Sequence, residues 1–199
     1  DVYKRQIDFF TVHPQAYWEW FAQENAREGV APNAAHRFVA DLERAGKLSA
    51  VVTQNIDGLH QRAGSERVLE LHGNWSRLTC TGCGEHVTLD DVDGARSGEV
   101  PRCPACASVL RPDIVFYGEM LDSDVIEGAV RAISEADLLI VAGTSLVVYP
   151  AAGLIDYYAG ERLVLMNATP TPYDSRADLI IREPVGQVFE ELGRRSRRP

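Results

Sequence analysis

Four cysteines form two closely spaced pairs. Cys80 and Cys83 stand in CTGC, and Cys103 and Cys106 stand in CPAC, with residues 84 to 102 between the pairs. Four thiolates at this separation can close a tetrahedron around zinc, and the spacing is typical of a zinc ribbon. Because four cysteine ligands would occupy all four coordination positions of the zinc ion, we expect a structural zinc that does not activate water. Two disulfides are the alternative, and no sign of export favours them.

A group of hydrogen-bonding side chains follows one apolar stretch. Residues 48–52 predict a buried strand, and Gln54, Asn55 and Asp57 come directly after it. Three side chains able to bind a sugar are thus crowded at one strand end, which favours a ligand site. A tight capped turn would use Asn and Asp as well.

Two further motifs have weaker chemical signals. His72 lies in LELHGNW, after an apolar stretch and before a glycine, where a histidine taken alone is more often a satisfied, partly buried side chain than a base. Gly143, Thr144 and Ser145 follow the apolar run ADLLIVA, where amides and small hydroxyls can meet a phosphate or a ribose. A turn with only a structural role remains the alternative there.

These residues require a scaffold of strands and helices. Two helices are expected between Phe9 and Leu48, the first ending on Gly29 and the second carrying Gly46 near its end. Short apolar runs in LSAVV, ADLLIVA, RLVLM and ADLII predict strands, with a helical stretch at 151–159 between two of them. This order indicates an α/β fold with a doubly wound, Rossmann-like parallel sheet covered on both faces, which binds ligands at the carboxyl ends of its strands.

Composition limits the class of protein. The 199 residues are 45% hydrophobic, enough for one core or for a core with a small satellite, and we expect a globular protein of the cytoplasm. No apolar run reaches the roughly 20 residues that span a bilayer. The net charge of −9 argues against a nucleic-acid binder, and the basic tail at 194–199 is interpreted as a solvated end.

Taken in order, TQNIDGLHQRAG, ELHG, the cysteine pairs, RPDIVFYGE, GTSL and NATPTPYD resemble the sirtuins, which are NAD-dependent protein lysine deacylases. The resemblance runs from about Ile7 to Leu192. It implies a Rossmann-like NAD-binding domain at 47–73 and 113–193. It also implies a small domain that combines a helical part at 7–46 with a zinc-binding module at 74–112.

The resemblance also implies an activity and its residues. In sirtuins the acyl oxygen of a modified lysine attacks C1′ of the nicotinamide ribose, and the His-Gly histidine, here His72, is the general base. The products are nicotinamide, O-acetyl-ADP-ribose and free lysine. Gln54, Asn55 and Asp57 would line the nicotinamide and ribose pocket, and Asn55 and Asp57 would serve catalysis. The adenosine half of NAD would meet Gly143, Thr144, Ser145 and Asn167.

The expected partner is an acetyl-lysine peptide or protein. By resemblance, Val115, Phe116 and Gly118 of IVFYGE would pair with it as with an added strand; an ordinary core strand is the alternative. Family members that favour succinyl or malonyl groups carry Tyr-x-x-Arg where this sequence has Trp20 and Gln23. Because neither is a cation, we expect acetyl or other uncharged short acyl groups.

The opening residues raise a separate expectation. Sirtuins begin with a strand, a Gly-Ala-Gly-x-Ser loop and an Asp-Phe-Arg segment, none of which is in this sequence. Residues 1–6, DVYKRQ, are what a transposon end used in sequencing libraries encodes, so adapter-derived residues are expected there; a natural short N-terminus is the alternative. Without its central first strand, the sheet would keep two unpaired edges, and NAD binding and activity would be weak.

Two other functions stay open at this point. One is a protein ADP-ribosyltransferase that uses the same NAD pocket, and the other is a non-catalytic zinc-ribbon module that binds a partner. We expect no direct nucleic-acid or membrane partner, and a monomer.

Overall fold

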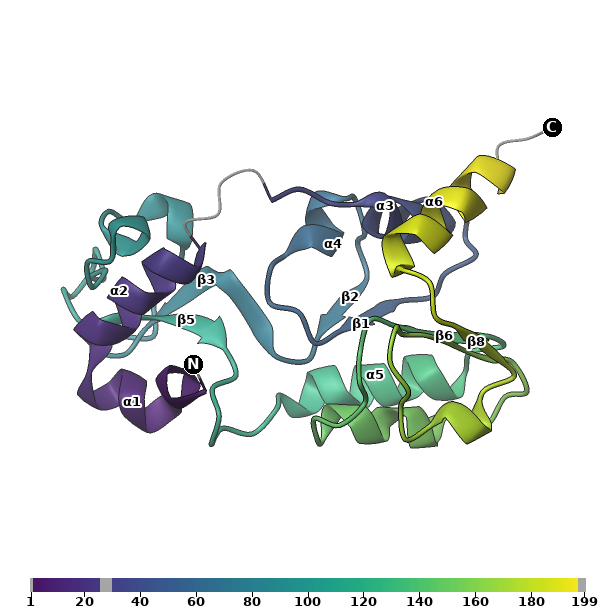
Figure 1. Ribbon diagram of the computed structural model, residues 1–199. Helices are drawn as coiled ribbons and strands as arrows, with labels where there is room; N and C mark the ends of the chain where they lie inside the picture. The colour runs from purple at the N-terminus through teal and green to yellow at the C-terminus, as the bar shows by residue number, and fades with distance from the viewer. Residues whose placement is uncertain (1, 26–29, 197–199) are drawn as a thin grey trace. The chain divides into compact units, whose positions relative to one another are not determined.

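The helical start of the chain is divided among several short helices in the computed structural model, which describes residues 2–25 and 30–196 (Figure 1). A 3-10 helix η1 (Tyr3–Arg5) precedes α1 (Ile7–Val12) and α2 (Pro14–Asn25). The sequence did not predict α1 as a separate helix; His13 interrupts the helical path with φ −129° and ψ 54°. Pro14 then restarts it, since proline is preorganised for the first helical position. The predicted end at Gly29 lies outside the described residues.

The second predicted helix is α3 (Ala34–Arg44). Its start is a capping box: the Asn33 side chain accepts hydrogen bonds from the amides of Ala35 and His36, and the His36 ring accepts one from the Asn33 amide. These bonds satisfy amides that have no partner inside the helix. The helix is followed by Gly46 with φ +67°, as the sequence predicted for this end.

The chain forms two compact units. Unit 1 comprises Asp1–Val30, Asn55–Gly58 and His72–Leu121, and unit 2 comprises Ala31–Gln54, Leu59–Leu71 and Asp122–Pro199. The expected helical segment at 7–46 is thus shared between the units, with α1 and α2 in unit 1 and α3 in unit 2.

Unit 1 is built on a three-stranded antiparallel sheet. Its order is β4-β3-β5, formed by β3 (Gly73–Cys80), β4 (His86–Thr88) and β5 (Leu110–Ile114), with 3-10 turns η2 (Leu89–Asp91) and η3 (Ala95–Ser97). The helices α1 and α2 pack against this sheet (Figure 1). The core between them consists mainly of aromatic residues and leucines, namely Phe10, Tyr17, Trp18, Phe21, Leu78, Leu89, Leu110 and Phe116.

Unit 2 contains the parallel strands. β1 (Val51–Thr53) pairs with β2 (Val68–Glu70), and β6 (Leu139–Ala142), β7 (Leu163–Met166) and β8 (Leu179–Ile181) form a second sheet. Helix α5 (Ser123–Ser134) and the 3-10 helix η4 (Ala151–Tyr157) lie on one side of the strands, and α3, α4 (Leu59–Arg62) and α6 (Val185–Ser196) lie on the other (Figure 1). This α/β architecture confirms the predicted class.

Several predicted elements differ in detail. The strand expected at 48–52 is β1, which begins three residues later, and β2 was not predicted as a strand. The helix expected at 151–159 is the 3-10 helix η4, the tighter form that short segments adopt. The single sheet is two sheets, because β1 and β6 do not pair with each other within the described residues.

None of the helices formed by the described residues has the length and apolar character needed to cross a bilayer.

Candidate functional site

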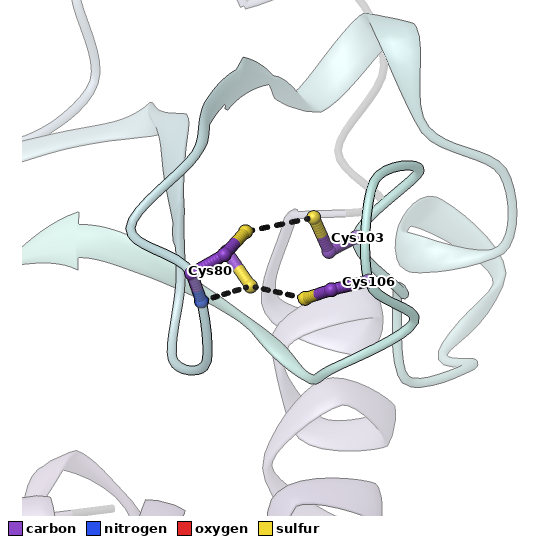
Figure 2. A group of neighbouring side chains, drawn as sticks. Cys80, Cys103 and Cys106 are labelled. Atoms are coloured by element: carbon purple, nitrogen blue, oxygen red, sulfur yellow. Dashed lines mark hydrogen bonds between the residues drawn. The ribbon is translucent and has the colours of Figure 1, made fainter.

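The four cysteines converge at one end of the sheet in unit 1 (Figure 2). Their sulfur atoms all lie within 4.8 Å of one another. Cys80 lies 3.4 Å from Cys106, and Cys83 lies 3.6 Å from Cys103, measured between Sγ atoms. Tetrahedral zinc with Zn–S bonds of about 2.3 Å requires S···S distances of about 3.8 Å. The cluster therefore has nearly the dimensions of a zinc tetrathiolate site.

Each cysteine pair forms the same turn. The amide of Gly84 donates to the carbonyl of Cys80, and the amide of Ala107 donates to the carbonyl of Cys103. Gly84 and Ala107 both follow the second cysteine of a pair and both have positive φ, of +76° and +61°. The amides of Gly82 and Ala105 point at Sγ of the preceding cysteine. Such amide donors stabilise thiolates, as a metal site requires.

The thiol pKa values are spread widely. An amide hydrogen bond from Cys83 lowers the pKa of Cys80, and hydrogen bonds from the Ser108 hydroxyl and amide lower the pKa of Cys106 to about 6. The Glu85 amide lowers the pKa of Cys83, but hydrogen bonds with the other three sulfurs outweigh it and raise that pKa to about 12. Four sulfur atoms this close together cannot all be thiolates without a positive charge among them. A divalent cation would allow all four to ionise, so the donor set fits zinc.

His72 lies at the junction of β2 and β3, next to an obligatory glycine. Gly73 has φ +76°, and a Cβ built there would lie 2.0 Å from the carbonyl oxygen of Asp113. The tight approach of β3 to β5 follows from this glycine. The carbonyl of His72 accepts a hydrogen bond of 3.0 Å from the Val115 amide, and the His72 side chain is half-buried. The structure therefore joins the His-Gly motif to the IVFYGE motif directly.

The segment Asn55–Gly58 lies with the start of β3. The amide of Trp75 donates to the carbonyl of Ile56 across 3.1 Å. Gly58 has φ +66°, and a Cβ there would lie 3.2 Å from the side-chain nitrogen of Asn74. Asn55 is exposed and Asp57 is half-buried. Unit 1 thereby holds Asn55 and Asp57 as well as His72.

The IVFYGE segment is a tight turn after β5. The amide of Glu119 donates to the carbonyl of Phe116, and the Glu119 carboxylate accepts from the Phe116 amide, so both main-chain groups of Phe116 are bonded within the chain. Phe116 itself is 2% exposed and belongs to the core of unit 1. The peptide-pairing role that the resemblance gives to the Phe116 main chain stays a prediction. Val115 and Gly118, the latter with φ +96°, remain candidates.

The remaining predicted residues lie in unit 2, with Gln54 directly after β1 and the others at the ends of β6 and β7. Gly143 follows β6 with φ +67°, and its amide donates to the carbonyl of Met166 at the end of β7. The Thr144 hydroxyl accepts from the Leu146 amide. Gly143, Thr144, Ser145 and Asn167 therefore follow adjacent strand ends, as parallel pairing requires.

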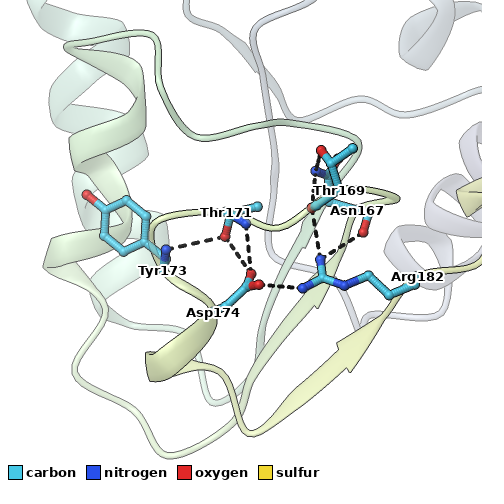
Figure 3. A network of polar contacts seen from close by, with 6 residues as sticks. All are labelled: Asn167, Thr169, Thr171, Tyr173, Asp174 and Arg182. Carbon is cyan, nitrogen blue, oxygen red and sulfur yellow. Dashed lines mark hydrogen bonds and ion pairs between the residues drawn. The ribbon is translucent and has the colours of Figure 1, made fainter.

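A polar network surrounds Asn167 (Figure 3). The Asn167 side chain donates to the carbonyl and the hydroxyl of Thr169. Arg182, which follows β8, donates to the carbonyls of Asn167 and Thr169, each across 2.9 Å. Its other terminal nitrogen pairs with Asp174, whose carboxylate also accepts from Thr171. One guanidinium thus fixes the path of the chain after β7.

Sequence reasoning assigned no role to Arg111, Glu119 or Arg182. Arg111 and Glu119 are part of the RPDIVFYGE motif, but nothing in their spacing indicated that they form an ion pair. Arg182 follows a predicted strand, which was a usable signal because strand ends collect functional groups in this fold.

Trp20 packs against an arginine. The Arg5 guanidinium lies over the Trp20 ring, 5.6 Å from its centroid. Neither Trp20 nor Gln23 is a cation, and the expectation of uncharged short acyl groups stays a prediction. Arg5 lies in the segment expected to be adapter-derived.

The geometry can be compared with known proteins. The Sir2 family profile matches residues 2–150. The NAD-dependent protein deacetylase of Clostridium acetobutylicum is 48% identical over 184 residues, which cover 92% of this chain and 75% of that protein. A structure of Sir2 bound to acetylated peptide matches with a TM-score of 0.88 at 42% identity, over 97% of this chain and 83% of that one.

A third similar protein is a Sir2 crystal structure in complex with the inhibitor EX-527, 2′-O-acetyl-ADP-ribose and deacetylated p53 peptide. It matches with a TM-score of 0.86 at 43% identity, over 97% of this chain and 84% of that one. The family profile covers more than half of the chain, and the relatives match across most of both sequences. The chain belongs to the Sir2 family.

Proposed function

We propose that this Sir2-family chain is an NAD-dependent protein lysine deacetylase that yields free lysine, nicotinamide and O-acetyl-ADP-ribose. Similar proteins are named NAD-dependent protein deacetylases, and similar structures hold acetylated peptide or 2′-O-acetyl-ADP-ribose. NAD supplies the electrophilic C1′ of its nicotinamide ribose when bound.

His72 would be the general base. A neutral imidazole nitrogen can accept a proton from a ribose hydroxyl. The tight Gly73 turn and the Val115 amide fix the main chain on which His72 is carried. His72 is half-buried. Asn55 and Asp57 would hydrogen-bond the nicotinamide ribose, together with Gln54.

The adenosine half of NAD would meet the ends of β6 and β7. Gly143 presents a main chain without a side chain, Thr144 and Ser145 supply hydroxyls, and Asn167 supplies an amide. This assignment is supported by the hydrogen bond from the Gly143 amide to the Met166 carbonyl, which holds the ends of the two strands side by side. Ligands of parallel sheets bind at such ends.

The acetyl-lysine peptide would pair with the IVFYGE segment. Because both main-chain groups of Phe116 are bonded inside the turn, we assign the peptide hydrogen bonds to Val115 and Gly118 and an apolar supporting role to Phe116. Zinc would be structural, held by the four cysteines, and would hold the module at 74–112 together.

The acidic net charge of −9 suits basic, lysine-rich peptides and disfavours direct nucleic-acid binding. We also propose that the protein is a cytoplasmic monomer that has no membrane partner. The NAD-binding domain would comprise 47–73 and 113–193.

The observation that carries the proposal is the hydrogen bond from the Val115 amide to the His72 carbonyl. It joins the main chain of the proposed base directly to Val115 of the proposed peptide segment, although 43 positions separate the two residues in the sequence (115 − 72). An unrelated zinc-ribbon binding module would have no need of this arrangement.

The test is NAD-dependent release of nicotinamide from an acetyl-lysine peptide, with mass spectrometry of both products. We expect release that depends on the acetyl group, and a loss of about 100-fold or more in His72→Ala. His86→Ala is the matched control, since His86 is an exposed histidine of the same unit. It should keep activity within about twofold. ADP-ribose retained on the peptide would instead identify a transferase.

A further inference from the structure

Arg111 and Glu119 form the most fully connected ion pair of unit 1 among the residues described. Nη1 of Arg111 lies 2.8 Å from Oε1 of Glu119, and Nη2 lies 2.9 Å from Oε2, so the contact is bidentate. Both side chains are 25% exposed. Bidentate pairs are directional as well as strong, because the planar fork matches the carboxylate plane. The contact therefore fixes an orientation as well as a distance.

The two side chains also bind the main chain of the turn. Nη2 of Arg111 donates to the carbonyl of Ile114 across 3.1 Å, and Oε2 of Glu119 accepts from the amide of Phe116 across 2.9 Å. The Arg111 guanidinium lies 5.1 Å from the centroid of the Phe116 ring. The pair thus holds the residues immediately before and after Val115.

Val115 has its own restraint in the middle of this arrangement. Its amide donates to the carbonyl of His72, which fixes the direction of the peptide plane between Ile114 and Val115. The Phe116 amide, fixed by Glu119, belongs to the same peptide plane as the Val115 carbonyl. Since that plane is rigid, Glu119 sets the direction in which the Val115 carbonyl points.

We propose that Arg111 and Glu119 are positioning residues for acetyl-lysine recognition, which orient the Val115 carbonyl to accept a hydrogen bond from the acyl-lysine substrate. This inference rests on the deacetylase function proposed above. The pair touches neither the reacting atoms nor NAD in this assignment; it acts through the main chain of Val115 and Phe116. Its effect should consequently fall on the peptide and spare NAD.

Two conservative variants separate geometry from charge. Arg111→Lys keeps the positive charge but loses the planar fork, since an ammonium cannot make the bidentate contact. Glu119→Gln keeps the shape and an oxygen for the Phe116 amide but loses the charge. Asp90→Asn is the matched control, because Asp90 forms an exposed ion pair with Arg96 in the same unit.

The experiment measures KM for an acetyl-lysine peptide and for NAD separately, with thermal melting and zinc content for each variant. Peptide affinity is also measured by fluorescence anisotropy without NAD, which tests the inference independently of turnover. We expect Arg111→Lys to weaken peptide binding and raise the peptide KM about tenfold, with the NAD KM within about twofold. Glu119→Gln should fall between Arg111→Lys and the parent, and Asp90→Asn should match the parent.

Parent-like peptide affinity in both variants would overturn the inference. A parallel change in both KM values that tracks the loss of melting temperature would also overturn it, because it would reveal a purely structural pair. Absence of turnover in the parent with tight acetyl-peptide binding would count against the proposed deacetylase activity, while the anisotropy comparison would still decide the role of the pair.

Discussion

The Val115 amide donates to the His72 carbonyl across 3.0 Å, so the proposed base and the proposed peptide segment are linked by one main-chain hydrogen bond. This bond depends on Gly73, the first residue of β3. Gly73 combines positive φ with a Cβ position that lies 2.0 Å from the Asp113 carbonyl oxygen. Any side chain there must push β3 away from β5, and with it His72 from Val115.

Gly73→Ala should therefore lower the free energy of unfolding by at least about 3 kcal/mol, because a left-handed alanine and a backbone clash are combined. Urea denaturation measures this loss. Gly46→Ala is the control: it has φ +67° but no atom within 4 Å of its Cβ position, and it should cost only about 1 kcal/mol. Equal losses in the two variants would contradict the role given to close packing.

Removing one zinc ligand should weaken the whole of unit 1. Cys80 and Cys103 are each 3% exposed and are part of the same core as Phe10 and Phe116. We expect Cys103→Ser to lose bound zinc, and both this variant and the chelated parent to melt at lower temperature. Ala105→Ser, an exposed change inside CPAC, should keep its zinc. Full zinc content in Cys103→Ser would refute the tetrathiolate assignment.

Acid should release the ion pair between Arg111 and Glu119. Burial raises the pKa of Glu119, but hydrogen bonds from Arg111 and the Phe116 amide outweigh it, so the net pKa lies below the ordinary value. Since the folded pKa is depressed, the pair stabilises the protein above the unfolded pKa of about 4.3, and that contribution is lost as pH falls through the folded pKa.

Stability measured by urea unfolding from pH 7 downward should consequently fall less steeply in Glu119→Gln than in the parent. Asp90→Asn serves as the control, because its exposed ion pair contributes little at any pH. A parent-like slope in Glu119→Gln would show that other carboxylates govern the acid response.

Arg182 should support the proposed adenosine contacts. Its guanidinium holds the carbonyls of Asn167 and Thr169 and pairs with Asp174, as Figure 3 shows. Arg182→Gln removes the fork, so we expect the KM for NAD to rise about fivefold while the peptide KM changes little. Arg194→Gln, which removes an exposed pair on α6, should leave both values unchanged. A rise confined to the peptide KM would show that Arg182 supports peptide binding and not the proposed adenosine contacts.

Acyl preference can be tested at Trp20. Neither Trp20 nor Gln23 carries a charge, and the Arg5 guanidinium is engaged with the Trp20 ring. We therefore expect acetyl-peptide to turn over at least about tenfold faster than succinyl-peptide, since a buried carboxylate without a cation is strongly disfavoured. The ratio should be the same in Arg5→Gln. Faster succinyl turnover that disappears in Arg5→Gln would assign Arg5 the role of the missing cation.

Local sequence determined the features that depend on spacing along the chain. Two C-x-x-C pairs predict four converging thiolates because each pair forms its turn from neighbouring residues, and the structure gathers all four. Apolar runs predict β6, β7 and β8, and the polar residues after them follow strand ends. Only β7 is mainly buried, whereas β6 and β8 keep exposed apolar residues. The ordered set of motifs was sufficient for the Sir2 resemblance.

Tertiary structure alone decided what depends on residues distant in sequence. The His72 carbonyl accepts from the Val115 amide although 43 positions separate them in the sequence (115 − 72), and Arg111 pairs with Glu119; residue spacing indicated neither contact. Likewise, the 3-10 form of η4 and the separation of β1 from β6 have no signature in local periodicity. Periodicity reports which residues are buried, whereas a hydrogen bond between two strands depends on their relative placement, which only the folded chain specifies.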